Sequence, residues 1–425
     1  MAIFKVVVIG SGAREHALVR TLLRGAAHGE PREVVAIPGN AGIAREVRCV
    51  PSAGSAAALA AAAIAEKPDL VVVGPEAPLA DGLADWLTDV GIPCFGPSAA
   101  AARIEASKAF AKEVMQAARV PTAAAAWFSD PAQARSLAST LGACVVKLDG
   151  LAAGKGVVVC DTPAEAVAAV DQLWALGGGA VTGTQLLVEE RLTGPELSVI
   201  ALCDGQRLLA LPPARDHKQL LDGGRGPNTG GMGAVSPPLD ATPALVDEVL
   251  RTVLQPAVDE LARRGTPFVG ALYAGLMLTP AGIRTLEFNC RLGDPEAQAM
   301  LLRLRGDLLP VLLACARGDV SGHALDVDPR ASVSVVLAAH GYPSTPRPGD
   351  AITGLEAIEQ AEDLQIFHAG VREVGGKLVT AGGRVLTVAA LGARVPHARS
   401  RAYVALAEIR FDGMQLRQDV GAAEA

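Results

Sequence analysis

The first hundred residues alternate short apolar runs with segments that suit helices, and this alternation limits the fold more than any other feature of the chain. Four runs have the length and composition of buried strands: KVVVIG (5–10), EVVAIPG (33–39), DLVVVGP (69–75) and IPCFGP (92–97). Helices are expected between them, at 14–25, 56–66 and 79–91. Because strands that alternate with helices are joined by right-handed crossovers, we expect a doubly wound, parallel α/β sheet.

The pattern changes at the helix expected over 107–121. It is followed by strands at 143–150 and 157–161, a helix near 163–176 and a further apolar run at 185–192. We expect a small α+β unit here. The next predicted elements are antiparallel strands at 196–205 and 207–216, a glycine-rich loop at 222–236, a helix at 243–264 and a hairpin at 273–280 and 283–290. Strand-like runs at 332–341, 366–370 and 382–392 predict a last α+β domain.

Composition excludes several classes of protein. Half of the 425 residues are hydrophobic, but the most apolar stretch, 56–66, is shorter than the roughly 18 residues that a membrane span needs. The chain passes from MAIFK directly into a strand, so we expect no signal peptide. The seven cysteines form no CxxC pair, which predicts reduced thiols and a cytoplasmic location. A net charge of −7 argues against nucleic acid as a partner.

The segment KLDGLAAGKG (147–156) looks like a phosphate-binding P-loop but departs from that pattern. Three residues instead of four separate Gly150 from Gly154, and Gly156 follows Lys155 where a Ser or Thr is required. Because apolar VVVC comes next, the loop is expected to join two strands. We predict a hairpin flap that covers phosphates, with Lys147 projecting from the strand below, and a plain glycine hairpin is the alternative.

The segment EFNCRLGDPE (287–296) is the candidate metal site. On a strand, Glu287 and Asn289 point to the same face. Two neighbouring oxygen ligands suit Mg²⁺, which takes its remaining ligands from phosphates and water. Arg291 is expected to continue that face and to grip a carboxylate or phosphate. An acidic strand end paired with Arg291 is the alternative interpretation.

Two glycine-containing turns are candidate anion sites of lower specificity. Gly10 and Gly12 stand between a strand and a helix, where backbone N–H groups can face a phosphate, and Arg14 adds charge. Glu15 occupies the place of the third glycine of a dinucleotide fingerprint, which disfavours a nicotinamide dehydrogenase. A tight turn is the alternative.

The loop PNTGGMGA (227–234) has three glycines and is also compatible with an ordinary mobile loop. His217 lies near no second histidine in sequence, which favours a structural hydrogen bond over metal or general-base chemistry.

Taken in order, these motifs closely resemble the phosphoribosylamine–glycine ligases, also called glycinamide ribonucleotide synthetases, of the ATP-grasp superfamily. The resemblance rests on GSGAREHAL (10–18), PGNAG (38–42), VGPEAPL (73–79), SKAFAK (107–112), DGLAAGKGV (149–157), GPNTGGMGA (226–234), YAGLM (273–277) and EFNCRLGDPE (287–296). It implies an N-terminal doubly wound α/β domain (1–104), a small ATP-grasp subdomain with the flap (105–193), a large ATP-grasp subdomain with the metal site (194–326) and a C-terminal α+β domain (327–425).

The resemblance also implies a reaction, the second step of de novo purine synthesis. ATP, glycine and 5-phosphoribosylamine give ADP, phosphate and glycinamide ribonucleotide, with Mg²⁺ or Mn²⁺ bound by Glu287 and Asn289. The glycine carboxylate attacks the γ-phosphate, and the amine then displaces phosphate from glycyl phosphate. We expect small-molecule partners alone, no nucleic acid or membrane, and a monomer or weak dimer.

Residue roles follow from the same resemblance. ATP is expected to contact Lys108, Lys147, Gly154, Lys155, Gly156, Glu189, Glu190, Leu192 and Glu196. Phosphoribosylamine is expected to face Gly10, Gly12, Arg14, Glu15, Asn40, Gly74, Pro75, Glu76, Lys218, Asn228, Thr229 and Gly230. Asp216 and Arg291 are assigned to the amino and carboxylate groups of glycine, and with Lys147 they form the predicted catalytic set.

This chain departs from the family pattern at a few positions. The family usually has Ala where Leu148 stands, Tyr where Val235 stands and Phe where Leu292 stands. An Arg has moved from position 219 to 215 and 225, and an acid is lost at Gly224. The ATP and metal residues match the family. Two alternatives follow: another ATP-grasp ligase with a different amine, or a nucleotide-binding regulatory relative that has lost turnover because of the changes at 215–225.

Overall fold

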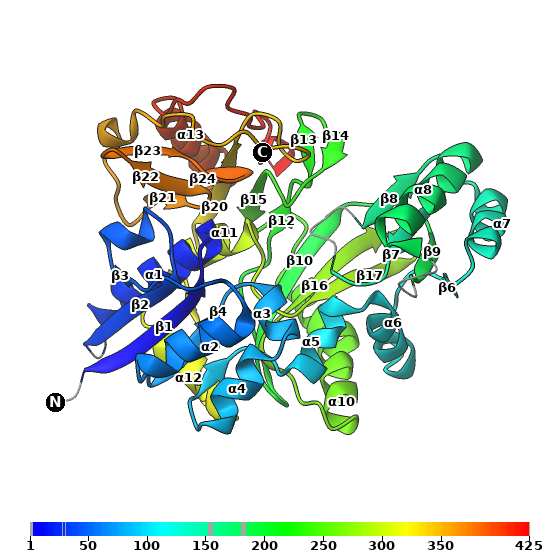
Figure 1. Ribbon diagram of the computed structural model, residues 1–425, viewed down its shortest axis with the longest axis horizontal. Coiled ribbons are helices and arrows are strands. Elements are labelled where there is room, and N and C mark those ends of the chain that lie inside the picture. Colours follow the sequence, from blue (N-terminus) through cyan, green and yellow to red (C-terminus); the bar gives the residue numbers. More distant parts are fainter. Residues whose placement is uncertain (1–2, 28, 30, 152–155, 180–183, 425) are drawn as a thin grey trace.

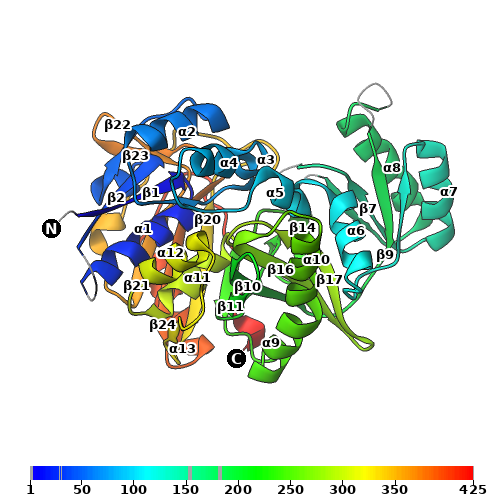
Figure 2. The same ribbon diagram turned by 90° about the horizontal axis from the view of Figure 1, so that it is seen from below.

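The computed structural model describes residues 3–27, 29, 31–151, 156–179 and 184–424. The N-terminal and C-terminal parts lie next to each other on one side of the molecule, and the middle of the chain forms the other side (Figure 1). A small lobe projects from the rest, as the view from below shows (Figure 2). Within the described residues, no helix is long and apolar enough to cross a lipid bilayer.

The N-terminal part is the doubly wound sheet that the alternating runs predict. Its elements are β1 Phe4–Gly10, α1 Ala13–Ala26, β2 Arg32–Pro38, η1 Ile43–Arg45, β3 Arg48–Cys49, α2 Ala56–Ala65, β4 Leu70–Val73, α3 Glu76–Ala80, α4 Leu83–Asp89 and β5 Cys94–Phe95. All five strands run parallel in the order β3-β2-β1-β4-β5. Strands β1 and β4 are neighbours, so the turns that follow them open at the same edge of the sheet.

The single helix predicted at 79–91 is wrong in extent. The structure has two shorter helices, α3 and α4, separated at Gly82. Gly82 has φ +89°, a left-handed conformation that interrupts a helix and that glycine adopts most easily. Leu79 and Leu83 on either side of the break are both fully buried, so the apolar periodicity continues across it.

The small lobe and the helices that lead into it carry the glycine-rich loop. Their elements are α5 Ala99–Ala106, α6 Lys108–Ala117, β6 Ala125–Phe128, α7 Pro131–Leu141, β7 Cys144–Leu148, β8 Val157–Cys160, α8 Pro163–Leu176 and β9 Leu186–Glu190. The strands form an antiparallel sheet in the order β6-β9-β7-β8. Lys147 lies opposite Val157 across the β7–β8 hairpin. The predicted strand–loop–strand arrangement is confirmed, and a P-loop, which runs into a helix, is excluded.

The next part contains the sheet with the predicted metal residues. Its elements are β10 Glu196–Asp204, β11 Leu208–Ala210, β13 Gln219–Leu221, β14 Arg225–Asn228, α9 Pro243–Val249, η3 Leu250–Leu254, α10 Gln255–Arg263, β16 Val269–Thr279, β17 Gly282–Asn289, α11 Glu296–Leu302, β18 Leu304–Arg305, α12 Leu309–Arg317 and β19 Asp326–Val327. The strand order is β11-β10-β16-β17, all antiparallel. The predicted helix at 243–264 contains a wider, π-helical turn, η3, just before Pro256, which has no N–H to donate.

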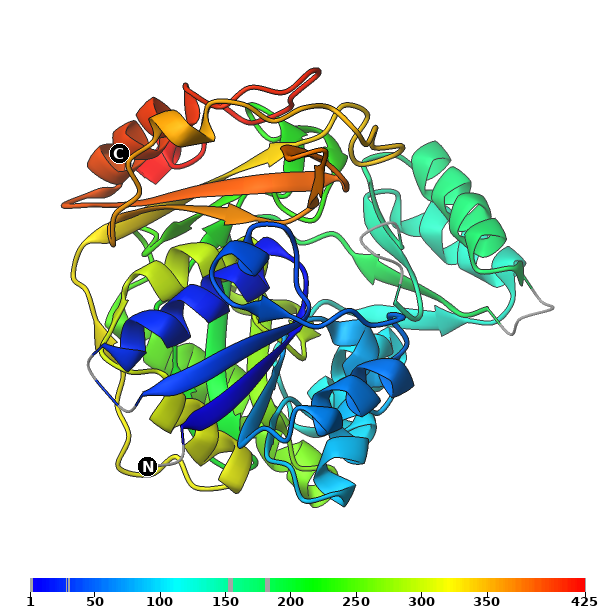
Figure 3. The ribbon, with the colours of Figure 1, turned by 60° about the vertical axis from the view of Figure 1, so that its left-hand side comes forward.

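The C-terminal sheet crosses the limit predicted at 326/327. It is built from β12 Arg215–Asp216, β15 Gly233–Ser236, β20 Ala331–Ala338, β24 Arg384–Gly392 and β21 Leu364–His368, in that order. The hairpin β22 Val371–Val374 and β23 Lys377–Thr380, the helix α13 Val395–Leu406 and the short turns η4 Leu355–Ala357 and η5 Ala422–Glu424 complete this part. Figure 3 shows this sheet above the N-terminal one.

The loop predicted at 222–236 is therefore wrong in part. Strand β14 pairs with β13, and β15 pairs with β20, with Gly233 opposite Val335. Local sequence does not contain this information, because the partner strand of β15 lies about a hundred residues further along the chain. The four domain limits given above stay a prediction.

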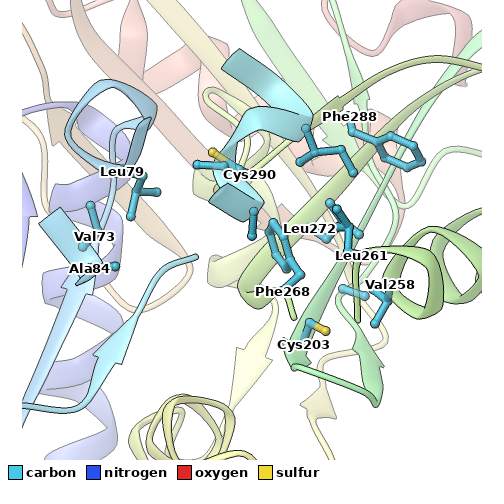
Figure 4. Close-up of a cluster of buried hydrophobic side chains, with 14 of the residues drawn as sticks. Val73, Leu79, Ala84, Cys203, Val258, Leu261, Phe268, Leu272, Phe288 and Cys290 are labelled. Atoms are coloured by element: carbon cyan, nitrogen blue, oxygen red, sulfur yellow. The ribbon is translucent and has the colours of Figure 1, made fainter. Parts of the chain in front are cut away.

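One continuous cluster of buried side chains joins the N-terminal sheet to the sheet that contains β16 (Figure 4). Val73 and Leu79 enter it from the N-terminal side, and Phe268 and Leu272 enter it from the start of β16. A close-packed core allows little relative movement of the elements that share it. This cluster therefore fixes the turns after β1 and β4 relative to the β16–β17 hairpin.

The cluster gives a prediction about stability. Phe268 is completely buried, so Phe268→Ala is expected to lower the free energy of unfolding by about 3–5 kcal/mol. Denaturant unfolding followed by intrinsic fluorescence and circular dichroism measures the change. The matched control is Leu239→Ala, because Leu239 is 67% exposed and its truncation should cost less than about 0.5 kcal/mol. Equal losses in both variants would contradict a shared core centred on Phe268.

Candidate active site

A cavity of about 550 Å³ lies where the turn after β4, helix α6, the β7–β8 and β16–β17 hairpins and the start of β24 converge. Its volume is in the range of about 300–1,000 Å³ that small-molecule sites occupy. The predicted site residues that line it are Arg14, Pro75, Glu76, Lys108, Lys147, Gly156, Glu189, Asp216, Lys218, Thr229, Gly230, Glu287, Asn289 and Arg291. The fold thus gathers into one cavity residues that the sequence spreads over most of its length.

Other predicted residues are not part of this lining in the described chain: Gly10, Gly12, Glu15, Asn40, Gly74, Glu190, Leu192, Glu196 and Asn228. Gly154 and Lys155 lie outside the described residues. Some of the outer groups are already used by the backbone. The side-chain N–H₂ of Asn40 donates to the carbonyl oxygens of Ser11 and His368, at 2.9 and 2.7 Å. A carboxylate oxygen of Glu190 accepts from the N–H of Ala124 at 2.9 Å.

The anion site predicted at the first glycine turn is filled by the chain itself. The N–H of Gly12 donates to Oε2 of Glu15 at 2.6 Å, which is the Glu half of a capping box at the start of α1. A Cβ atom on Gly10 would come within 2.6 Å of the Glu15 side chain, so this glycine makes room for the carboxylate. Oε1 of Glu15 in turn accepts from Nε of Arg14 at 2.6 Å. The turn therefore positions Arg14 at the cavity and does not itself face it.

Three lysines and one buried carboxylate form the positive end of the cavity. Lys147 and Lys112 approach the two oxygens of Glu189, with Nζ–O distances of 2.8 and 2.9 Å. Lys108 lies in the first turn of α6, which Ser107 caps, and its Nζ donates to the carbonyl oxygen of Gly150 at 2.8 Å. Three ammonium groups gathered at one end of the cavity offer several cationic donors to a polyanionic ligand.

Glu287 and Asn289 have the properties of cation ligands. Both lie on β17, two residues apart, and Gly275 opposite Glu287 leaves that side of the hairpin open. Within the described residues, neither side chain makes a hydrogen bond or an ion pair. Burial alone would raise the pKa of Glu287, but the charges of Lys218, Lys147 and Arg291 hold it below its ordinary value. The Glu287 carboxylate is thus ionised and makes no hydrogen bond or ion pair among the described residues.

These donors fit a divalent cation that is shared with phosphates. In the described part of the chain, no group of three or more His, Cys, Asp and Glu side chains is arranged as a closed metal site. A cation on the two β17 oxygens would take its other ligands from a nucleotide and water, the mode that Mg²⁺ commonly uses.

A second charged group lies across the cavity on β12 and the residues after it. Lys218 approaches Glu196, with Nζ and Oε2 2.6 Å apart. Burial, together with the nearby Glu296 and Glu196, raises the pKa of Asp216 to about 8, although Lys218 opposes the shift. Asp216 is therefore a lining carboxylate that changes charge near neutral pH.

Arg291 does not continue the strand face as the sequence predicts, because β17 ends at Asn289. It lines the cavity from the segment that follows. Its guanidinium lies between two carboxylates, with Nη2 3.0 Å from Glu105 and Nε 3.3 Å from Glu76. Burial alone would lower the pKa of Arg291, but these two carboxylates raise it above its ordinary value. The guanidinium is therefore permanently charged. A ligand carboxylate at Arg291 would compete with Glu105 and Glu76.

The departures from the family pattern lie outside the cavity lining. Arg215 pairs with two carboxylates. Its Nη2 lies 2.7 Å from Oδ1 of Asp240, and it also pairs with Glu424 near the carboxyl terminus. Arg225 is exposed at the start of β14. The changed apolar positions Leu148, Val235 and Leu292 are all buried side chains. They adjust packing and do not alter the charges of the cavity.

Several lining residues were missed by the sequence prediction. Asp294 and Glu296 belong to the quoted segment EFNCRLGDPE but follow its strand. Lys112 stands four residues after Lys108, a spacing that places both on one face of α6 and that could have been used. Tyr342 and Arg384 reach the cavity from the C-terminal part, and no local pattern marks them.

Comparison with known proteins gives the class first. Residues 106–297 match the family model described as phosphoribosylglycinamide synthetase, ATP-grasp (A) domain. The biotin carboxylase domain of Hydrogenobacter thermophilus 2-oxoglutarate carboxylase, solved with MgADP, has the same fold. It superimposes with a TM-score of 0.74 at 17% identity, over 98% of this chain and 92% of that one. The fold is therefore that of the ATP-grasp proteins.

The remaining matches give the family. Residues 4–105 and 332–423 match the N and C domains of phosphoribosylglycinamide synthetase. The phosphoribosylamine–glycine ligase of Streptomyces coelicolor is 50% identical over 99% of each chain. A crystal structure of that ligase from Thermotoga maritima has a TM-score of 0.83 at 32% identity, covering 98% of this chain and 99% of that one. The chain belongs to the phosphoribosylglycinamide synthetase family, which confirms the resemblance seen in the sequence.

Proposed function

We propose that the protein ligates glycine to 5-phosphoribosylamine at the expense of ATP, giving glycinamide ribonucleotide, ADP and phosphate. The observation that carries this proposal is the cavity in which Lys218, Lys147 and Lys108 act on an ionised Glu287 that makes no hydrogen bond or ion pair among the described residues, within a chain of this family. A carboxylate that attacks a polyphosphate needs concentrated positive charge and exclusion of water more than it needs a general base.

In this proposal the positive end of the cavity binds the phosphates of ATP. Lys147 and Lys108 neutralise charge on the transferred phosphoryl group as the glycine carboxylate attacks it. A Mg²⁺ or Mn²⁺ ion on Glu287 and Asn289 would screen the negative charge of the phosphates and help to orient them. The hairpin loop after β7, part of which lies outside the described residues, would exclude water.

The second half of the reaction uses the opposite side of the cavity. The amine of phosphoribosylamine attacks the carbonyl carbon of glycyl phosphate, the C–N bond forms, phosphate leaves and the amine loses a proton. Arg14, Pro75, Glu76, Thr229 and Gly230 line the cavity on this side. Arg14, positioned by Glu15, is the cation best placed to hold the acceptor's phosphate.

The test measures phosphate release from ATP with glycine and freshly prepared phosphoribosylamine, and omits each substrate in turn. We expect release only when all three are present. Turnover without the amine, or preference for another amine, would indicate a different ATP-grasp ligase. ATP binding without turnover would indicate a regulatory relative, although the changes at 215–225 that suggested one lie outside the cavity lining.

The pKa of Asp216 gives a prediction about pH. If the Asp216 carboxylate binds the ammonium group of glycine, its raised pKa of about 8 leaves it mostly protonated at lower pH. The KM for glycine should then fall by up to about tenfold per pH unit from about pH 6 to about pH 8 and level off above that. Initial rates at varied glycine concentration measure it. An unchanged pH profile in Asp216→Asn would refute the assignment.

The same shift affects stability with a defined sign. Because the pKa of Asp216 is raised in the folded state, its contribution to folding is fully present below its unfolded value near 3.8 and is lost as pH rises to about 8.

Cytoplasmic location and a monomeric or weakly dimeric state also belong to the proposal, and size-exclusion chromatography with light scattering tests the oligomeric state.

A further inference from the structure

Arg384 enters the cavity from the C-terminal sheet, where it is the first residue of β24. Its Nη1 donates to two carbonyl oxygens, those of Gly230 and Asp294, both at 2.6 Å. Its Nη2 donates to the carboxylate of Asp294 at 2.8 Å. The guanidinium of Arg384 thus bonds to two turns that are distant in sequence, one at Gly230 and one at Asp294.

Tyr342 holds the same turn from its other side. The N–H of Gly230 donates to the hydroxyl oxygen of Tyr342 at 2.9 Å, so the C-terminal part engages both the N–H and the C=O of Gly230. A Cβ atom on Gly230 would lie only 3.2 Å from the guanidinium carbon of Arg384 and 3.3 Å from the Tyr342 hydroxyl. A side chain at this position would press on both groups that hold the turn.

The turn that Arg384 holds is connected to the charged groups on the acceptor side of the cavity. The N–H and the hydroxyl of Thr229 both donate to the carbonyl oxygen of Lys218, at 2.8 and 2.7 Å. By contrast, no contact of Arg384 reaches Lys108, Lys147 or Glu189 among the described residues.

We propose that Arg384 is a positioning residue for the acceptor amine: with Tyr342, it fixes the 229–231 turn and Asp294 in the geometry that binds phosphoribosylamine. The C-terminal part therefore determines acceptor affinity while leaving the ATP end of the cavity unaffected. This inference rests on the proposed function for the identity of the acceptor. The contacts need the forked guanidinium, because one ammonium group cannot reproduce the same planar set of donors.

The test compares Arg384→Ala, Arg384→Lys and Tyr342→Phe with Arg372→Ala, an exposed arginine of the same C-terminal part that serves as the control. We expect the KM for phosphoribosylamine to rise about tenfold or more in Arg384→Ala and somewhat less in the other two site variants. The KM values for ATP and glycine should stay within about twofold of the wild type. Millimolar guanidinium should partly restore the acceptor KM of Arg384→Ala but not that of Tyr342→Phe.

Hydrogen exchange of the peptide that covers 226–232 provides a readout without turnover. We expect faster exchange there in Arg384→Ala than in the control, with unchanged exchange in α6 and β17. Equal rises in all three KM values, or an unaltered acceptor KM, would overturn the proposal. If the wild-type chain does not use phosphoribosylamine, the proposed function fails, whereas the exchange experiment still decides whether Arg384 holds the turn.

Discussion

Glu287→Gln is expected to abolish turnover while leaving the fold intact. The carboxylate is ionised and has no partner among the described residues, so its removal breaks no internal contact. An amide supplies a weaker oxygen ligand with no charge, and a cation shared with the phosphates would be lost. Since changes to outer partners of metal ligands alone cost about 10–100-fold, we expect a loss of at least about 100-fold in kcat/KM.

ADP formation at increasing Mg²⁺ or Mn²⁺ concentration measures this loss, and thermal unfolding checks the fold. Glu248→Gln, at an exposed position on α9, is the control with the same chemical change. Chelation with EDTA should reduce the wild-type enzyme to the level of the variant, and added metal should restore the wild type only. Near-normal activity of Glu287→Gln at saturating metal would refute the assignment of the metal to β17.

The end of the cavity proposed to bind ATP was largely predictable as a structure, because its signals in the sequence are local. A glycine loop between two apolar runs predicts the hairpin, and alternation on β17 places Glu287 and Asn289 on one face. The strands of the N-terminal sheet were predictable for the same reason, since each run has a clear length and flanking turns. Such features need no knowledge of the partners that each segment meets.

The side of the cavity proposed to bind the acceptor was less predictable, because its structure depends on contacts between distant segments. Gly10 and Gly12 look like an anion site in sequence, but the carboxylate of Glu15 occupies the N–H of Gly12. Arg291 looks like a free cation, but Glu105 and Glu76 bind it. In both cases a carboxylate from the protein takes the place that a local pattern assigns to a ligand.

The contribution of the C-terminal part could not be derived from local patterns at all. Strand β15 pairs with β20, and Arg384 contacts Gly230, over sequence separations of about a hundred residues or more. Periodicity and turn signals describe neighbours along the chain, whereas these contacts depend on how the sheets pack. Arg215, one of the changes at 215–225 that looked like a functional difference in sequence, pairs instead with Asp240 and with Glu424 near the carboxyl terminus.

Lys147→Met is expected to have the second large effect on activity. Because Lys147 pairs with Glu189, a double variant can separate its effect on the ligand from its effect on that carboxylate. Lys147 is buried with its Nζ 2.8 Å from Glu189, at the end of the cavity proposed to bind the transferred phosphate. Removing one charged group aimed at a developing negative charge commonly costs about 10²–10³-fold in kcat, and we expect a loss of this size in ADP formation. Lys377→Met, at an exposed hairpin position, is the control.

The double variant Lys147→Met/Glu189→Gln decides whether the lysine acts on the ligand or only on its neighbour. In the single variant Glu189 keeps Lys112 as a partner, at 2.9 Å, so the melting temperature should fall only moderately. Changing Glu189 to glutamine as well leaves Lys112 without its carboxylate, so the double variant should be no more stable than the single variant. Activity should stay low, because no ammonium group returns to the phosphate. Recovery of turnover in the double variant would mean instead that Lys147 serves only to compensate the buried charge of Glu189.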